Sequence, residues 1–302
     1  MAETGNFAVS KKIKVVISYM SAVSENKWEI SGKTSYWGWN LKELWGYRHL
    51  LRSLVRRDFL LNYQQTVLGP IWILIQPIMT LVTYVIVFGK MVGIGTGSIP
   101  PVLFYFSGIV LWNFFNDSFT GTSFTFKENA HIFSKVYFPR IVMPLSVIST
   151  HFLRFLMQLV LLVLLMVYYW LFLDSGLLFS FGMFAVPVII FLVGVIGLSL
   201  GLFFSVVTAK YRDLMNVVSL GVRLFMFVTP VIYPVSTVPE NVRWMVELNP
   251  LTPLFELFRF TLLGEGHVTG YGLIYSVSFA ALALLGSTLL FNKQGDKLID
   301  IV

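Results

Sequence analysis

Residues 62–77 read NYQQTVLGPIWILIQP, and this stretch decides the fold. It begins with polar residues, turns at Gly69-Pro70 and continues as a hydrophobic segment with a second proline, Pro77. Because adjacent glycine and proline mark a turn, we expect the chain to change direction there. The residues before the turn are polar and charged, whereas long apolar runs fill most of the chain after it. The turn therefore marks the boundary between a polar N-terminal part and a membrane part.

The composition predicts an integral membrane protein. Hydrophobic residues make up 56% of the 302 residues and charged residues 12%, about half of the roughly 25% usual in globular domains. The apolar residues form long runs rather than helical stripes, which is the membrane pattern. The absence of cysteine excludes disulfides and thiolate metal sites. The formal charge of +7 lies mainly where an inner leaflet would be, so we expect lipid rather than nucleic acid as its partner.

We expect an all-α membrane protein with six transmembrane helices. A cytoplasmic arm covers residues 1–39, an amphipathic interface helix and linker 40–69, the membrane domain 70–291 and a cytoplasmic tail 292–302. Each expected span is near or above the ~20 residues that cross the bilayer, and Pro230 and Pro234 interrupt the fifth. The six spans are predicted at about 71–88, 102–126, 147–173, 177–207, 217–234 and 272–291.

Lysine and arginine counts predict the orientation. With a cytoplasmic N-terminus, seventeen basic residues lie in cytoplasmic segments and three on the other face. Positive charge favours the cytoplasmic side. Both termini are therefore expected in the cytoplasm.

The interface helix carries two faces. Leu44, Tyr47, Leu51 and Leu54 share an apolar face, and three arginines lie at i, i+4 and i+8 on another: Arg48, Arg52 and Arg56. A helix of this kind lies flat in the headgroup region. The arginines, together with Arg223 of the fifth span, are candidates for binding a phosphate headgroup, because the guanidinium donates paired hydrogen bonds. The alternative for the stripe is generic attraction to anionic lipid.

The connection between spans five and six contains two short amphipathic segments, at about 240–248 and 253–263. Neither is long enough to span. A re-entrant helical hairpin in the outer leaflet is expected, because irregular backbone is tolerated there only where protein or water supplies partners. An ordinary surface loop is the alternative.

Ionisable residues within spans are costly and suggest function. Asp117 belongs to a polar stripe on the second span and Arg154 to another on the third, so we expect the two to form an ion pair, with a role in transport as the alternative. Aromatic residues within the spans favour an interfacial belt or, alternatively, a channel for sugar rings. The channel-lining candidates are Trp72, Tyr84, Phe88, Asp117 and Arg154.

No phosphate-binding G-x-x-x-x-G-K-[ST] motif occurs, so energy for transport has to come from a partner or an ion gradient. Two cytoplasmic connections, 127–140 and 209–216, are candidates for docking an ATPase, and simple solvated connectors are the alternative. The docking candidates are Lys127, Ile132, Phe133, Tyr137, Arg140, Tyr211 and Arg212.

The motif Y-x-x-T-x-L-G-P-x-W-x-x-x-x-P, here Tyr63 to Pro77, resembles the start of the first span in ABC exporter permeases for O-antigen, capsule and teichoic-acid polymers. The F-P-R-x-x-x-P sequence at 138–144, the Y-R-D turn at 211–213 and N-P-x-x-P at 249–253 are also similar. The resemblance covers about residues 41–291.

This resemblance implies the permease subunit, not itself an enzyme, of an ATP-driven exporter of a lipid-linked polysaccharide in the bacterial inner membrane. It also implies a homodimer, two ATP-binding cassette subunits that hold Mg-ATP, no cofactor in this chain, and a channel at the dimer interface. Gating by the hairpin is implied as well, with Trp244, Asn249, Pro250 and Pro253 as candidates. The alternatives are an exporter of drugs or small lipids and a membrane-embedded transferase, although paired carboxylates or a His/Asp cluster expected of a transferase are missing.

Overall fold

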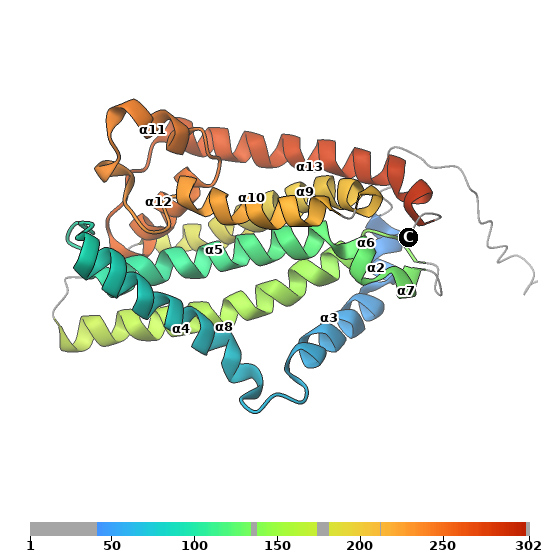
Figure 1. Ribbon diagram of the computed structural model, residues 1–302, viewed down its shortest axis with the longest axis horizontal. Coiled ribbons are helices and arrows are strands. Elements are labelled where there is room, and N and C mark those ends of the chain that lie inside the picture. The colour runs from blue at the N-terminus through green and yellow to red at the C-terminus, as the bar shows by residue number, and fades with distance from the viewer. Residues whose placement is uncertain (1–40, 134–137, 174–180, 212, 300–302) are drawn as a thin grey trace, which may run out of the picture. The chain divides into compact units, whose positions relative to one another are not determined.

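The computed structural model describes residues 41–133, 138–173, 181–211 and 213–299, and these residues form helices and connections without a strand (Figure 1). The predicted arm over residues 1–39, and the docking candidates Tyr137 and Arg212, lie outside the described residues. The all-helical fold class is confirmed.

The helices follow one another along the chain with short connections. Their bounds are α2 (Leu41–Gly46), α3 (Arg48–Tyr63), α4 (Trp72–Tyr84), α5 (Pro101–Ser123), α6 (Thr125–Glu128), α7 (Ala130–Phe133), α8 (Val142–Phe172), α9 (Val186–Lys210), α10 (Leu214–Val228), α11 (Glu240–Glu247), α12 (Thr252–Leu263) and α13 (Gly270–Ile299). Shorter turns of helix are η1 (Gly69–Ile71), the π-helix η2 (Val85–Val92), η3 (Phe181–Ala185) and η4 (Val235–Thr237).

The predicted turn at Gly69-Pro70 is confirmed. Gly69 has a φ of +54°, a backbone conformation that a residue without Cβ adopts at little cost. Pro70 then stands at the start of η1, where its missing N–H is no loss. The chain therefore leaves α3 and enters the apolar helix α4 at the expected residues.

Pro77 lies inside α4 and is buried. Because proline has no N–H, it cannot donate to the carbonyl of Ile73 four residues earlier. The Gln158 side chain of α8 donates to that carbonyl instead, at 3.4 Å, and accepts from Asn113 of α5 at 3.3 Å. The amide of Gln158 thus joins three helices at the point where proline interrupts one of them.

Among the residues that the structure describes, four helical segments are long and apolar enough to cross a membrane, namely residues 69–92, 142–172, 182–210 and 270–294. They show a multi-pass membrane protein. α5 has 23 residues and is therefore long enough to cross the membrane, but it carries more polar residues than these four segments. α10 has 15 residues and ends at Val228, two residues before Pro230, so it is shorter than the predicted span at 217–234. At about 1.5 Å per residue it measures roughly 22 Å, less than the ~30 Å hydrocarbon core.

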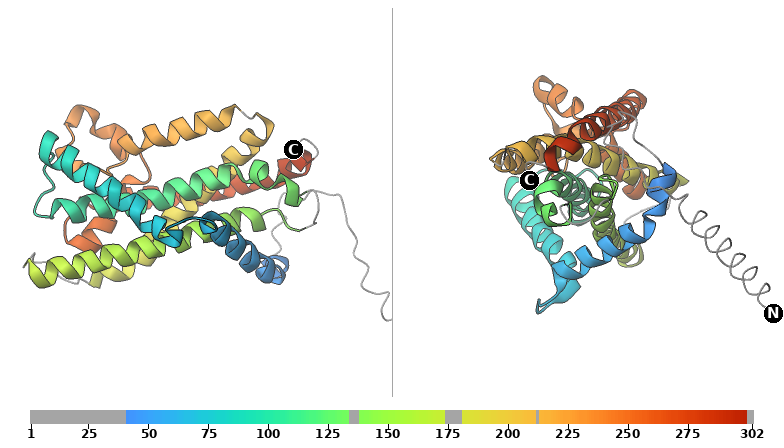
Figure 2. Two further views of the ribbon diagram at one scale, coloured as in Figure 1. Left: turned by 60° about the horizontal axis from the view of Figure 1, so that its bottom comes forward. Right: turned by 90° about the vertical axis from the view of Figure 1, so that its right-hand side faces the viewer.

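α5 lies at the centre of the helices, as the end-on view in Figure 2 shows, and packs most extensively against α9 and α8. The close approach to α9 depends on glycines. A Cβ added at Gly197 would lie 3.2 Å from the Ser118 Cβ, and one added at Gly201 would lie 2.5 Å from the Thr122 Cβ. The G-x-x-x-G sequence of residues 197–201 therefore serves close helix packing.

Replacing Gly201 by alanine should destabilise the protein by about 1–3 kcal/mol, because the methyl group would overlap Thr122. Gly221 of α10 is a matched control, since a Cβ there meets no atom within 4 Å. Gly221→Ala should be neutral or stabilising by up to ~1 kcal/mol through helix propensity. Thermal unfolding in detergent measures both, and equal effects of the two substitutions would contradict this packing argument.

The amphipathic nature of α3 is confirmed, but its apolar face meets protein. Leu44, Tyr47, Leu51 and Leu54 pack, together with Leu50, against a residue of α7 and residues from 138 into the start of α8. These partners are Phe138, Val142, Met143 and Ile132. A helix lying flat in the headgroup region would place this apolar face on lipid. In the structure the face packs against protein, because α8 and the residues before it offer an apolar surface there.

Candidate functional site

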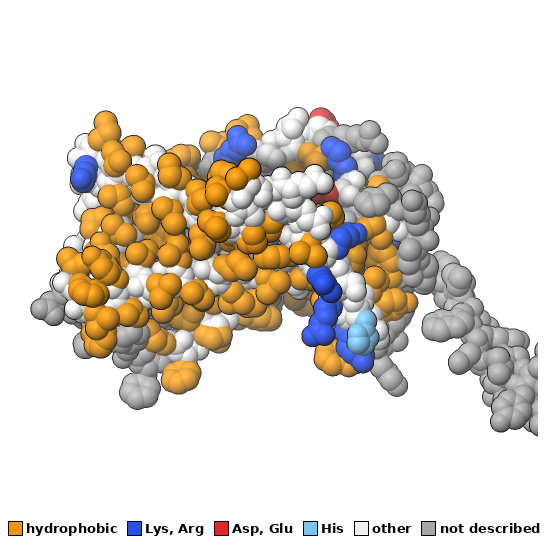
Figure 3. Space-filling view, turned by 90° about the horizontal axis from the view of Figure 1, so that it is seen from below, with side chains coloured by type: hydrophobic (Ala, Val, Ile, Leu, Met, Phe, Trp, Pro, Cys, Tyr) orange, Lys and Arg blue, Asp and Glu red, His pale blue; other side chains and the backbone are white. Residues whose placement is uncertain are grey.

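The three arginines at i, i+4 and i+8 lie on the exposed side of α3. Figure 3 shows Lys and Arg side chains in a line that borders the apolar surface of the molecule. Arg48 Nη1 donates to the Trp45 carbonyl at 3.2 Å, and its guanidinium lies 5.8 Å from the Trp45 ring centre. Arg223 is also exposed but belongs to α10, so the structure groups only Arg48, Arg52 and Arg56. We call these three the arginine stripe.

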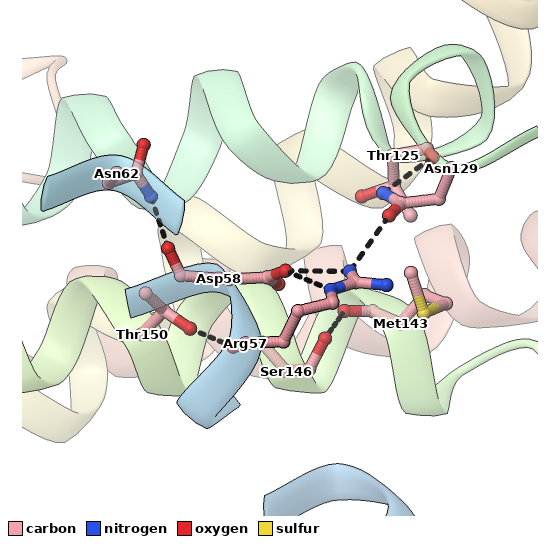
Figure 4. Close-up of polar contacts among 8 residues, drawn as sticks. All are labelled: Arg57, Asp58, Asn62, Thr125, Asn129, Met143, Ser146 and Thr150. Atoms are coloured by element: carbon pink, nitrogen blue, oxygen red, sulfur yellow. Dashed lines mark hydrogen bonds and ion pairs between the residues drawn. The ribbon is translucent and has the colours of Figure 1, made fainter. Parts of the chain in front are cut away.

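The next arginine, Arg57, has a different position. It is partly buried, and its Nη2 donates to Asp58 Oδ1 at 2.6 Å and to Asn129 Oδ1 at 3.4 Å (Figure 4). The Asn129 amide in turn donates to the carbonyl of Thr125 in α6 at 3.1 Å. Arg57 therefore ties α3 to the segment that follows α5. The sequence reasoning missed this residue, because Arg57 looks like one more basic residue beside Arg56.

A pocket of about 420 Å³ lies between α3, α5 and α8, next to this contact. We call it the polar pocket, because ten of its fourteen lining residues carry amide, hydroxyl, carboxyl, imidazole or guanidinium groups. Its polar lining residues are Asp58 and Asn62 of α3, Asn116, Asp117 and Thr120 of α5, Thr150, His151 and Arg154 of α8, and Glu128 and Asn129 after α5. Leu61, Gly121, Phe124 and Val147 complete the lining.

The polar stripes predicted on the second and third spans face each other here. Asp117 accepts from Asn116 at 3.0 Å, and its Oδ2 lies 3.9 Å from His151 Nδ1. Arg154 also lines the pocket, but its guanidinium lies 5.6 Å from the Tyr63 ring centre. Among the described residues no direct ion pair joins Asp117 to Arg154. The predicted direct pair is therefore wrong, because helix spacing fixes depth along a helix and not which partner a long side chain takes.

Tyr63 ends α3 beside this pocket. Burial raises the pKa of its phenol above the ordinary value, and Asp117 raises it further while Arg154 lowers it. The phenol is therefore uncharged near pH 7, and the Arg154 guanidinium already lies over its ring.

The aromatic candidates of the first span separate in space. Trp72 is exposed, whereas Tyr84 and Phe88 are half-buried and meet each other edge to face at 5.4 Å. Tyr84 also contacts Tyr105 of α5 at 6.4 Å. Their role in lining a channel stays a prediction.

The docking candidates also differ in exposure. Lys127 and Tyr211 are exposed, and Lys210 Nζ lies 5.1 Å from the Tyr211 ring centre. Ile132, in contrast, packs against the apolar face of α3, and Arg140 is half-buried. The side chain of Phe133, like Tyr137 and Arg212, lies outside the described residues. Lys127 and Tyr211 are therefore the described candidates with a free surface.

Of the predicted gate residues, Trp244 in α11 is exposed, whereas Asn249, Pro250 and Pro253 are buried. Asn249 Nδ2 donates to Thr229 Oγ1 at 2.8 Å, and Ser276 of α13 donates to the carbonyl of Pro250 at 2.7 Å. Hydrogen bonds thus tie the connection between α10 and α13 to the end of α10 and to α13. Most residues of α12, which lies within this connection, are buried.

α12 also holds a buried ion pair that sequence reasoning missed. Arg259 Nη1 lies 3.4 Å from Glu256 Oε1, and both side chains are almost fully buried. The guanidinium lies 3.8 Å from the Phe104 ring centre of α5, and Nη2 donates to the carbonyl of Val231 at 2.8 Å. The i, i+3 spacing of the two charges on a short apolar helix is the signal that could have found them.

Comparison with known proteins agrees with this architecture. The model of the ABC-2 type transporter family matches residues 49–263. Two O-antigen export system permease proteins RfbA of Klebsiella pneumoniae are 28% and 29% identical, each over 84% of this chain and 95% of the relative. The protein of the same name from Myxococcus xanthus is 30% identical over 72% of this chain and 82% of its own. This chain therefore belongs to the ABC-2 type transporter family.

Proposed function

We propose that this protein is the permease subunit of an ATP-driven exporter of a lipid-linked O-antigen polysaccharide. The observation that carries the proposal is the similarity to relatives named O-antigen export permeases. In two of these relatives the match covers 95% of their length. Membership of the ABC-2 type transporter family supports a transport subunit rather than an enzyme. A drug or small-lipid exporter has no comparable support.

The assembly that fits is a homodimer of six-span subunits in the bacterial inner membrane, with both termini in the cytoplasm. α5 and α10 supply the two spans beyond the four apolar ones. Because α10 alone is shorter than the hydrocarbon core, its span includes the residues that follow it up to Pro234. Two separate ATP-binding subunits hold Mg-ATP and dock beside Lys127 and Tyr211. The connection around α12 acts as the gate on the opposite side.

Deleting the gene tests the function directly. Loss of surface O-antigen, with lipid-linked polymer retained on the cytoplasmic side and export restored by the intact chain, is expected. The highly purified chain alone should not hydrolyse ATP. Normal surface O-antigen in the deletion strain, or hydrolysis abolished by a mutation within this chain, would overturn the proposal.

The docking surface leads to a second prediction. Substituting alanine for Tyr211 should uncouple ATP hydrolysis from export without loss of folded protein, because the side chain is 51% exposed. Ile132→Ala is the matched comparison: it should lower stability by up to about 2 kcal/mol, because Ile132 packs against α3. Export and ATPase rates of the reconstituted complex measure the first effect, and unchanged coupling in Tyr211→Ala would place docking elsewhere.

A further inference from the structure

We propose that the polar pocket binds a sugar residue of the transported polysaccharide, through its uncharged hydroxyl groups, on the side of the membrane where the polymer enters. This inference rests on the proposed function, which it deepens by assigning a ligand and a site. The pocket lies between the interface helix α3 and the adjoining ends of α5 and α8, so a polymer that approaches along the interface meets it before the spans.

The size of the pocket suits a small polar group. Its volume of about 420 Å³ falls within the ~300–1,000 Å³ typical of small-molecule sites. Its walls provide donors and acceptors together: Asn62 and Asn116 offer both through their amides, and Thr120 through its hydroxyl. Each sugar hydroxyl is itself both a donor and an acceptor, so it matches walls of this mixed chemistry.

Some hydrogen-bonding capacity in the walls is unused by the protein. Thr120 Oγ1, His151 Nδ1 and Arg154 Nε are buried and have no hydrogen-bond partner in the described part of the chain. A buried polar atom without a partner costs about 1–3 kcal/mol. Three such atoms belong to side chains that line one pocket, whereas the other unpartnered hydroxyl groups of α5, those of Tyr105, Ser118 and Thr122, belong to side chains that do not line it. A group that enters the pocket is therefore the candidate partner for the three.

The charges of the pocket favour a neutral ligand over a phosphate. Three carboxylates, those of Asp58, Asp117 and Glu128, line it against the single guanidinium of Arg154. Asp58 is additionally bound by Arg57 at 2.6 Å, but the remaining acidic groups would repel an anion. The arginine stripe on the exposed side of α3 is the better place for a phosphate, because it presents three guanidinium groups.

The approach of α8 to α5 at this point depends on Gly121. A Cβ there would lie 2.8 Å from His151 Nε2 and 2.8 Å from a Val147 methyl group. Any larger side chain would thus push His151 and Val147, both lining residues, out of place. The absence of a side chain at this position keeps the wall of the pocket in its present form.

Photo-crosslinking in exporting cells tests the site. Leu61 lines the pocket, and its neighbour Leu60 on the same helix is also exposed but does not line it. With p-benzoylphenylalanine at position 61, irradiation should join the cell's own polysaccharide to the protein, seen as a periodate-sensitive adduct of high mass. We expect at least tenfold more of this adduct at position 61 than at 60.

A variant of the wall completes the test. Thr120→Val removes one hydroxyl with little change of shape, and it should reduce the adduct at position 61 several-fold at an unchanged protein level. Thr83→Val is the matched control, because Thr83 lies exposed on α4 and away from the pocket.

Equal adducts at positions 60 and 61, adducts with phospholipid alone in cells that export normally, or unchanged adducts in Thr120→Val would each overturn the assignment. The deletion strain reports separately on the proposed function: if export continues without this chain, the function fails. If export requires the chain but no polysaccharide adduct forms at position 61, only the pocket assignment fails.

Discussion

Replacing Arg259 by methionine should destabilise the protein by about 3–5 kcal/mol, the cost of leaving one member of a buried ion pair unpaired. The substitution would leave the Glu256 carboxylate, 3% exposed, without its cation, and the Val231 carbonyl without the donor at 2.8 Å. It would also remove the cation from the face of Phe104. Because these contacts join α12 to α5 and to the turn after α10, the expected result is loss of folded protein in thermal unfolding.

The double variant Glu256→Gln with Arg259→Met separates charge from shape. Glutamine can still accept the hydrogen bond that the His267 N–H donates at 2.8 Å, while no charge remains buried. The double variant should therefore be more stable than Arg259→Met alone. A double variant that loses as much as the sum of both single changes would refute the pairing.

A second pair on the same side of the molecule serves as a control. Arg243 and Glu247 in α11 lie 3.8 Å apart with side chains 32% and 57% exposed. An exposed pair of this kind contributes about 0–1 kcal/mol. Arg243→Met should therefore have a small effect, and a loss comparable to that of Arg259→Met would contradict the role given to burial.

The sequence predicted those features that depend on local pattern. The turn at Gly69-Pro70 and the two faces of α3 each follow from the residue types at a fixed spacing. Such features are decided within one or two turns of helix, so a single sequence carries enough information to place them.

Features that depend on which helices meet were less accessible. The Pro77 gap in α4 is filled by Gln158, a residue 85 positions away from the carbonyl that it bonds. No local pattern in the sequence aims the Gln158 side chain at Ile73. Likewise, Arg56 and Arg57 are neighbours in sequence, and the packing of α3 on α8 decides that Arg57 is partly buried while Arg56 is exposed.

Replacing the three arginines of the stripe by glutamine should abolish most export. Each basic residue near an anionic surface contributes about 1 kcal/mol, so three together give ~3 kcal/mol, or roughly a hundredfold in the attraction of phosphate-bearing lipid to α3. The fold should persist, because Arg48, Arg52 and Arg56 are exposed and the apolar face of α3 packs against α8 without them.

The corresponding triple lysine variant tests what kind of attraction operates. Lysine retains the charge but lacks the planar fork that donates two parallel hydrogen bonds to a phosphate. If the stripe captures the diphosphate of a lipid-linked saccharide, export should fall in the lysine variant as well, while its protein level and membrane association stay at those of the parent. Export can be measured as surface polymer against lipid-linked polymer retained inside. Full export by the lysine variant would show that the stripe supplies charge alone, as general attraction to anionic lipid requires.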